Sequence, residues 1–450
     1  MTWSLPKTKY PVLIFHVDVN SAFLSWSALK QLQEQPDSVD LRTIPSAVAG
    51  DVETRHGIIT AKSIPAKKYG VRTAEPVASA LRKCPGLVLV KSDFKTYKMY
   101  SGKLMEILKS YSPEVEKVSI DEAYLEMSHI WDVSSDMPAS GDGGAVPESV
   151  LHVPILMAQR IRDEVRESLG FTVNVGISVN RLLAKTASDF TKPDQTHTLW
   201  PEEIPEKLWP LAIGELHGCG QATSRRLQQI GILTVGDAAR TDPEVLKSLL
   251  GERTGEYILR SSKGISSPHV CGERGDAKSY SNETTTASDI TAEDFETRAL
   301  PILRRLSGSV SARLKRDGVY GQAVTVTVKT DHFRRRTRQM TLSSSTADEE
   351  EIFLAARNLA EELLFGEGGP FRIGENVRLL GVGVSKLDRG EYRQMNLFEY
   401  LKEVRGDKQD GQSEERKERE EKLDRMLEKI RKKYGENAVR RGSDAPPPGS

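Results

Sequence analysis

Residues 119–126 read SIDEAYLE and place two adjacent acids, Asp121 and Glu122, inside a run of apolar residues. The apolar neighbours predict one buried strand across residues 117–127. Successive strand residues point to opposite faces, so one acid should face the interior unless a bulge or a strand end re-aims it. Because a buried carboxylate is costly without a balancing positive charge, the pair predicts a site for a divalent cation.

A third acid, Asp18, follows the apolar run VLIFHV at residues 12–17, which predicts a second buried strand. Apolar strands of α/β proteins often end at the active-site edge of their sheet. Three carboxylates from two strands could share two hard cations. Taken singly, each acid could equally be a solvated strand end or a capping group.

The bulk composition fits a multidomain protein of 450 residues. Lys plus Arg equals Asp plus Glu at 64 each, so the total charge argues neither for nor against nucleic acid. Cys84, Cys219 and Cys271 are far apart and lack metal-site spacing, which indicates reduced thiols. No apolar run is long enough to span a bilayer, and no secretory segment follows the first Met, so we expect a cytoplasmic protein.

Apolar periodicity predicts alternating strands and helices in the first half of the chain, which suggests an α/β layer architecture. The expected strands are 46–49, 57–61 and 172–178, and the expected helices are 94–111 and 155–168. Residues 132–149 are rich in Ser, Gly, Asp and Pro and predict a solvated loop insertion.

The second half of the chain begins with a compact helical block at 211–250 and a polar linker at 261–277. A second α/β unit should follow from 278 to about 388. Its expected elements are strands at 322–329, 337–342 and 377–384 and a helix near 349–364. From residue 402 the chain is densely charged, with one apolar stripe at helical spacing.

Four motifs occur in one order along the chain and together are far more specific than any one of them. They are FHVDVNSAF at 15–23, ITAKSIPAKKYG at 59–70, SIDEAYL at 119–125 and GISVNRLLAKTA at 176–187. In order and spacing the chain resembles the Y-family translesion DNA polymerases, in their bacterial DNA polymerase IV and UmuC-like branch. The resemblance covers residues 10 to 390.

The resemblance implies an α+β multidomain fold arranged as a right hand, with a ferredoxin-like palm, small fingers, a helix-hairpin-helix thumb and an α/β little finger. We assign the palm to 1–45 and 101–200, the fingers to 46–100, the thumb to 201–260, the linker to 261–277, the little finger to 278–390, and a clamp-binding peptide with the charged tail to 391–450.

The resemblance also implies the chemistry. Asp18, Asp121 and Glu122 would be catalytic and would hold two Mg²⁺ ions, or Mn²⁺ as a substitute, with the Val19 carbonyl as a further ligand. The implied activity is template-directed DNA synthesis on primer-template DNA from deoxynucleoside triphosphates, with low fidelity and no proofreading.

Further residues take implied roles around the nucleotide. Phe23 matches the steric gate, although its spacing alone favours a core aromatic. Lys185, Ser119 and Lys67 match nucleotide-binding positions, while an exposed helix position is the ordinary alternative for a Lys. The chain departs from the family at Ile64 and Lys67, where the family usually has Tyr and Arg, and at Ala22, where a second aromatic is common.

Two regions have features of DNA binding. Gly218, Gly220 and Arg225, followed by Arg226, resemble a thumb hairpin that presents backbone N–H groups to a phosphate. From Arg298 to Arg338 there are eleven Lys or Arg against two Asp, including Arg334, Arg335 and Arg336. This local excess predicts a surface that contacts phosphates.

The segment QMNLF resembles the peptide that bacterial polymerases insert into a sliding clamp, with Gln394, Leu397 and Phe398 as its anchors. We expect a monomer that meets no membrane. Two alternatives use the same residues: a catalytically weak or silent DNA- and clamp-binding accessory factor, and a nucleotide cyclase on a similar palm. The cyclase leaves the thumb-like block and the basic second unit unexplained.

Overall fold

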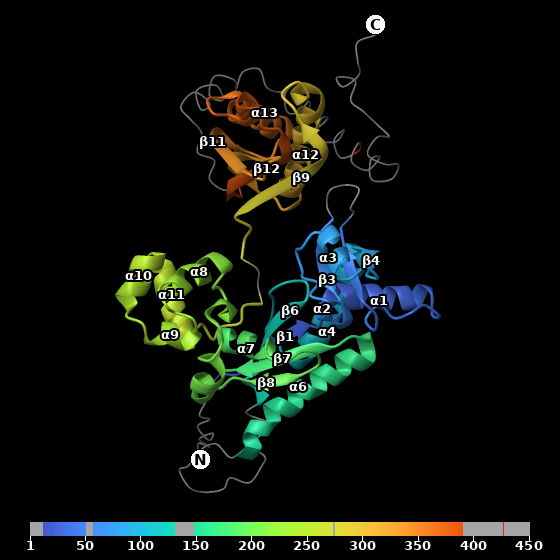
Figure 1. The fold of residues 1–450 in the computed structure, drawn as a ribbon, viewed down its shortest axis with the longest axis vertical. Helices are drawn as coiled ribbons and strands as arrows, with labels where there is room; N and C mark the ends of the chain where they lie inside the picture. Colours follow the sequence, from blue (N-terminus) through green and yellow to red (C-terminus); the bar gives the residue numbers. More distant parts are fainter. Residues whose placement is uncertain (1–11, 51–56, 131–147, 273–274, 390–425, 427–450) are drawn as a thin grey trace, which may run out of the picture. The chain divides into compact units, whose positions relative to one another are not determined.

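The computed structural model describes residues 12–50, 57–130, 148–272, 275–389 and 426. The chain divides into two compact units, Met1–Asp276 and Ala277–Ser450. Figure 1 shows both units. Within the described residues, no helix combines the length and apolar character needed to cross a membrane.

The first unit is organised around a five-stranded sheet in the order β5-β6-β1-β7-β8 (Figure 1). Its strands are β1 (Ile14–Val19), β5 (Val115–Lys117), β6 (Glu122–Glu126), β7 (Val173–Ser178) and β8 (Thr196–Thr198). The helices α4 (Phe94–Tyr111) and α6 (Glu148–Leu169) complete a βαββαβ succession with β1, β5, β6 and β7. The succession is that of a ferredoxin-like fold, as predicted for the palm.

The two faces of this sheet differ in character because strand residues alternate. Phe15, Val17 and Val19 of β1 belong to the main apolar core, together with residues of β6, β7, α4 and α6. His16 and Asp18 point to the opposite face. The helix α7 (Arg181–Ser188) packs there, against β7 and β1.

A smaller subdomain is inserted between α1 (Ala22–Glu34) and α4, at the place predicted for the fingers. It holds a three-stranded sheet in the order β3-β2-β4 and two short helices. The elements are β2 (Ser46–Ala49), β3 (Ile59–Lys62), α2 (Ile64–Lys68), α3 (Val77–Lys83) and β4 (Val88–Lys91). Its own core includes Ala47, Ile59 and Val77, and Val48 packs against Leu24 of α1.

A helical block follows β8. Three short turns, Pro201–Glu203, Ile204–Leu208 and Ile213–Glu215, precede α8 (Gln221–Gln229), α9 (Val235–Arg240), α10 (Pro243–Leu250) and α11 (Glu252–Ser262). The side chains of Thr234 and Asp242 cap α9 and α10. Leu227, Leu246 and Ile258 form the core of the block.

The second unit repeats the βαββαβ succession with another strand order, β11-β10-β12-β9, all antiparallel (Figure 1). Its elements are β9 (Ser279–Ile290), α12 (Leu300–Arg316), β10 (Tyr320–Thr330), β11 (Arg335–Thr346), α13 (Glu349–Phe365) and β12 (Val377–Asp388). Val324, Val326 and Val328 of β10 pack with both helices in one core. None of the helices described between residues 277 and 389 covers the opposite face of the sheet, called here the helix-free face.

Several predicted elements differ from the structure. The single strand across 117–127 is wrong: β5 and β6 form an antiparallel pair, and the N–H groups of Val118 and Ser119 donate to the Glu122 carbonyl to close the turn between them. The loop 132–149 ends too late, because α6 begins at Glu148.

The predicted linker begins too early, because α11 continues to Ser262. Val270 is buried against Ile14 and Tyr124, so part of the polar stretch packs on the first unit. The elements β9 and α12 were missed. Their Thr- and Ser-rich or Arg-rich sequences hide the apolar period, and their packing against the rest of the unit stabilises them.

Candidate active site

A row of three polar residues crosses the centre of the first sheet. In the strand register, Asp18 of β1 lies directly opposite Glu122 of β6 on one side and Asn174 of β7 on the other. Directly opposed residues share a face, so all three side chains lie on the face away from α4 and α6. Asp18 is buried and Asn174 is fully buried.

Gly176 brings α7 onto this face. It lies opposite His16 in the register, two residues along β7 from Asn174 and therefore on the same face of the sheet. A Cβ atom at Gly176 would lie 2.0 Å from the Ala184 carbonyl oxygen and 2.4 Å from the Ser188 nitrogen. Only glycine therefore lets α7 lie directly on the sheet. His16 Nδ1 is 2.8 Å from Ser188 Oγ and ties down the end of the same helix.

Two ammonium groups contact the carboxylates of the row. Lys185, on α7, lies 2.7 Å from Glu122 Oε1 and 3.3 Å from Asp18 Oδ2. Lys192 lies 2.7 Å from Asp18 Oδ1. Asp189 contacts both lysines, at 3.3 Å from Lys185 and 3.0 Å from Lys192. Each oxygen of Asp18 thus has its own cation.

The pKa values of this cluster are shifted by burial and by these pairs. Burial alone would raise the pKa of Asp18, but Lys185 and Lys192 together lower it. Burial and the neighbouring Asp18 raise the pKa of Glu122. Burial alone would lower the pKa values of Lys185 and Lys192, but the Asp18 charge and the other carboxylates raise both. The lysines are therefore firmly cationic.

Asp121 stands at the edge of the same row. Its carbonyl oxygen accepts from the Val19 N–H at 3.0 Å, which joins the end of β1 to the turn before β6. Its carboxylate accepts from Ser119 Oγ at 2.6 Å. The strand end re-aims the acidic pair, so Asp121 and Glu122 do not follow simple strand alternation.

The donors of this site fit a hard cation, although they are not preassembled around one. Among the residues that the structure describes, no three His, Cys, Asp or Glu side chains converge as a ready-made ligand set. The lysines contact Asp18 and Glu122, while Asp121 faces Ser119. Mg²⁺ commonly takes one or two carboxylates and completes its shell with waters and substrate phosphates. The oxygen-only set suits that mode of binding.

Phe23 lies in the first turn of α1 and is half-buried. Its ring stacks on Tyr97, with centroids 4.5 Å apart and planes at 8°, and meets Phe94 edge-on at 5.8 Å. The ring packs against the main core and is partly exposed, so the core does not enclose it fully.

The departures in the fingers lie on α2. Ile64 is 46% exposed and Lys67 is exposed, so neither serves the core. Ala22 is buried at the start of α1. At the end of β3, burial and the Lys67 charge lower the pKa of Lys62, which donates to Thr73 Oγ1.

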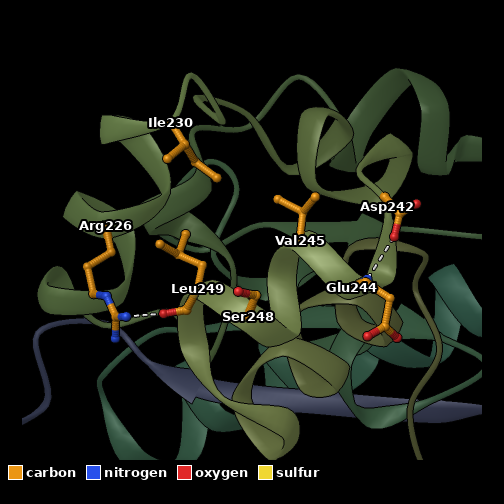
Figure 2. Close-up of a pocket in the computed structure, with 7 residues that line it drawn as sticks. All are labelled: Arg226, Ile230, Asp242, Glu244, Val245, Ser248 and Leu249. Atoms are coloured by element: carbon orange, nitrogen blue, oxygen red, sulfur yellow. Dashed lines mark hydrogen bonds between the residues drawn. The ribbon is translucent and has the colours of Figure 1, made fainter.

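In the helical block, Gly218 has φ +84°, and a Cβ atom there would meet the Tyr257 hydroxyl at 2.5 Å. Gly220 is the N-cap of α8 and has open space around it. Arg225 is exposed. Arg226 instead donates to the Leu249 carbonyl across a shallow groove between α8 and α10 (Figure 2). That groove is lined by Ile230 and Val245 and contains none of the predicted catalytic residues.

The arginines of the second unit do not act as one group. Arg334 pairs with the buried Glu375 at 2.9 Å, and Arg336 donates to the Gly368 carbonyl. Arg335, on the helix-free face, pairs with Glu283 at 2.9 Å. The count of eleven cations between Arg298 and Arg338 missed these acids, because they lie outside that stretch.

The clamp-binding residues Gln394, Leu397 and Phe398, and the tail except Met426, lie outside the described residues.

Comparisons with known proteins agree with this geometry. The impB/mucB/samB family model matches residues 17–189, its C-terminal-domain model matches 277–397, and a DNA polymerase-iota thumb-domain model matches 214–266. The chain is 37% identical to DNA polymerase IV of Clostridium acetobutylicum, over 95% of this chain and 97% of that relative. The chain belongs to the Y-family DNA polymerases. It is therefore a DNA-directed DNA polymerase that synthesises DNA on a template.

Other Y-family relatives agree. DNA polymerase IV 1 of Bacillus subtilis is 32% identical over 96% of this chain and 92% of its own, and DNA polymerase IV of Methanoculleus marisnigri is 34% identical over 86% and 98%. A solved Y-family polymerase chimera of Dbh and Dpo4 matches the fold with a TM-score of 0.68, at 22% identity, over 83% of this chain and 98% of that chain. Enzymes of this family use divalent metal ions.

Sequence reasoning missed four residues of this Y-family site: Lys192, Asp189, Asn174 and Gly176. Gly176 opens the fourth motif, and Asp189 and Lys192 follow it closely, so their positions were a usable signal. Asn174, inside an apolar strand, is a polar residue at a position that the pattern reserves for the interior.

Proposed function

We propose that Asp18, Asp121, Glu122 and the Val19 carbonyl hold two Mg²⁺ ions, for which Mn²⁺ can substitute. When bound, the ions would activate the primer 3′-hydroxyl and neutralise charge on the triphosphate. The observation that supports this most is the register of β1 and β6, which puts Asp18 and Glu122 side by side on the face away from α4 and α6. Ser119 would orient Asp121 through its 2.6 Å hydrogen bond.

The nucleotide would be held by cations on two sides. Lys185 is firmly cationic and is anchored on α7, so it can act as a point charge on the triphosphate. Lys67 on α2 is exposed and available for the same phosphates. Lysine lacks the bidentate fork of arginine, and Ile64 has no hydrogen-bonding group, so we expect weaker nucleotide binding than in relatives with Tyr and Arg there.

Phe23 would be the sugar gate. Its ring stacks on Tyr97 while the residue stays partly exposed. A rigid ring under the sugar excludes a 2′-hydroxyl by steric clash.

DNA would be bound by both units. In the thumb, Gly218 and Gly220 shape the turn before α8, whose first N–H groups suit a phosphate, and Arg225 adds an exposed charge. In the second unit, the helix-free face would track the backbone through Arg335, with Arg334 and Arg336 near the same strand.

We also propose a clamp tether at Gln394, Leu397 and Phe398, a monomeric enzyme, and a cytoplasmic location. The tether would raise the local concentration of the polymerase at primer ends. Small fingers should leave the nucleotide site open, so copying should be of low fidelity and without proofreading.

Primer extension with Mg²⁺ tests the metal assignment. We expect wild type and Glu106→Ala, which removes an exposed acid on α4, to extend a primer, while Asp121→Ala does not. Extension by Asp121→Ala at the wild-type rate would refute the assignment. Absence of extension by all three proteins would refute it as well.

A further inference from the structure

Lys192 contacts the carboxylate that is central to the proposed metal site. Its ammonium nitrogen lies 2.7 Å from Asp18 Oδ1, and Lys185 occupies the other oxygen, Oδ2, at 3.3 Å. Both oxygens that a metal would use are therefore already paired with protein cations. A divalent ion that approaches Asp18 must compete with them.

The loop that carries Lys192 is fixed by a buried network. Asn174, the neighbour of Asp18 on β7, donates from Nδ2 to the carbonyls of Ser188 and Thr191, and its Oδ1 accepts from the Gln195 N–H. Such buried amides are costly unless fully bonded, and this one is bonded at both ends. The position of Lys192 is therefore built into the fold.

A second anchor holds the same loop from α6 and from Asn20, the residue after β1. Asn20 Oδ1 accepts from the Asp194 N–H at 2.9 Å, and Arg162 donates to Asp194 Oδ1 at 2.9 Å. Both sides of Lys192 are thus tied down, which leaves its flexible side chain as the movable part.

Lys192 also has another partner within reach. The ammonium nitrogen of Lys192 lies 3.0 Å from Asp189 Oδ1, and the Asp189 side chain is 48% exposed. The Lys192 side chain is itself 35% exposed, against 11% for Lys185. Lys185 also contacts Asp189, but it is mostly enclosed and its shortest contact is with Glu122, a proposed ligand. Lys192 is more exposed and can leave Asp18 while keeping Asp189, which is not a proposed ligand, as its partner.

We propose that Lys192 is the displaceable counter-ion of the metal site: it neutralises Asp18 while metal is absent and shifts to Asp189 when a divalent ion takes the Asp18 oxygen. This inference rests on the proposed function of Asp18. It makes Lys192 and Asp189 positioning residues that set how tightly metal binds, and it explains why the acids are stable side by side before metal arrives.

Direct metal binding tests the inference without relying on activity. Free Mn²⁺ is measured by electron paramagnetic resonance with the full chain, in the absence of DNA and nucleotide, at neutral pH and fixed ionic strength. Lys192→Met should tighten Mn²⁺ binding roughly tenfold, the size expected for losing one charge-assisted hydrogen bond. Lys207→Met, which removes a charge that pairs with Glu203, should change it less than about twofold.

A double-mutant cycle tests the role of Asp189 as the alternative partner of Lys192. Asp189→Asn should weaken Mn²⁺ binding, because it leaves Lys192 with Asp18 as its main partner. In the Lys192→Met background at least half of that effect should disappear. Equal effects of Asp189→Asn in both backgrounds would mean that Asp189 acts only through its own charge. That result would overturn its role as the alternative partner of Lys192.

Unchanged or weaker Mn²⁺ binding by Lys192→Met would overturn the inference. The proposed metal site is judged separately, by whether Asp18→Asn abolishes primer extension. Extension that needs Asp18, together with unaltered Mn²⁺ binding in Lys192→Met, refutes the counter-ion role alone. Extension that survives Asp18→Asn refutes the site itself.

Discussion

The two sheets of the chain follow the same βαββαβ succession, but the charged pairs on them differ in their exposure to solvent. In the first sheet, Lys185 and Lys192 sit on Asp18 with side-chain exposures of 11% and 35%, against 12% for the acid. On the helix-free face of the second sheet, Arg335 pairs with Glu283 at exposures of 55% and 44%. Asp18 and Lys185 are enclosed by the protein, Lys192 is partly exposed, and the Arg335–Glu283 pair is open to solvent.

The difference shows which charged groups have fixed partners: the enclosed Asp18 and Lys185 do, and the exposed Arg335 and Glu283 do not. A partly buried pair is screened weakly, so removing one partner leaves a charge that is costly to keep. An exposed pair contributes at most about 1 kcal/mol and can exchange partners, for instance with a phosphate. The palm should therefore be sensitive to single changes, and the second unit should be tolerant of them.

The largest effect should come from Asp18→Asn. The change removes the charge that faces both lysines and that the proposed metals need. We expect primer extension to fall roughly 1000-fold or more. Steady-state kinetics measures the loss, with the exposed Glu106→Ala as control. A loss below tenfold would show that the enclosed charges of the palm are dispensable.

Gly176→Ala tests whether close packing creates the enclosed site. The new Cβ atom would meet backbone atoms of α7 that cannot swing away, so α7 must lift from the sheet. We expect a loss of about 3 kcal/mol in unfolding free energy, measured by denaturant titration. Gly220→Ala, where the Cβ has open space, is the matched control and should change stability by less than about 1 kcal/mol.

Phe23→Ala should relax sugar selection. We expect ribonucleotide incorporation relative to deoxynucleotide to rise roughly tenfold to 100-fold, because the steric exclusion is removed. Single-nucleotide insertion kinetics measures the ratio. Phe94→Ala removes a neighbouring ring and keeps the stacking of Phe23 on Tyr97, so it should leave the ratio within about twofold.

Alkaline unfolding should distinguish the enclosed lysine. The folded-state pKa of Lys185 is raised above its ordinary value near 10.5, so its stabilisation is complete below that pH and is lost as pH rises through the folded pKa. Above pH 10.5 wild type should lose about 1.4 kcal/mol per pH unit through this group. Denaturant titrations in EDTA should show a shallower slope for Lys185→Met. Identical slopes would contradict the assignment.

The smallest effect should come from Glu283→Gln. It frees Arg335 on the helix-free face, so primer-template DNA should bind about two- to threefold more tightly, while Arg335→Ala should reduce the salt slope of binding by about one. Fluorescence anisotropy over a salt series measures both. Glu362→Gln frees Arg338, which lies opposite Val326 on the helix side, and should leave DNA binding unchanged.

Much of the fold could be predicted from the sequence, because apolar period and four ordered motifs are local signals. The apolar period predicted the buried strands of the palm and α4. The ordered motifs indicated the inserted fingers and the family. These signals failed at the turn between β5 and β6, where Val118 and Ile120 continue the apolar run through a local hairpin. They also failed at β9 and α12, where polar side chains mask the period and packing against distant elements decides the structure.

The sequence by itself determined which acids we propose as metal ligands, since Asp18, Asp121 and Glu122 stand out as charges within apolar runs. Only the tertiary structure decided what faces them. Lys185 and Lys192 reach Asp18 because Gly176 admits α7 and Asn174 holds the following loop, and both conditions depend on strand register. Likewise, the local count of arginines could not show the glutamates that face them. These pairs join residues that are far apart in the sequence, so no short stretch of sequence contains both partners.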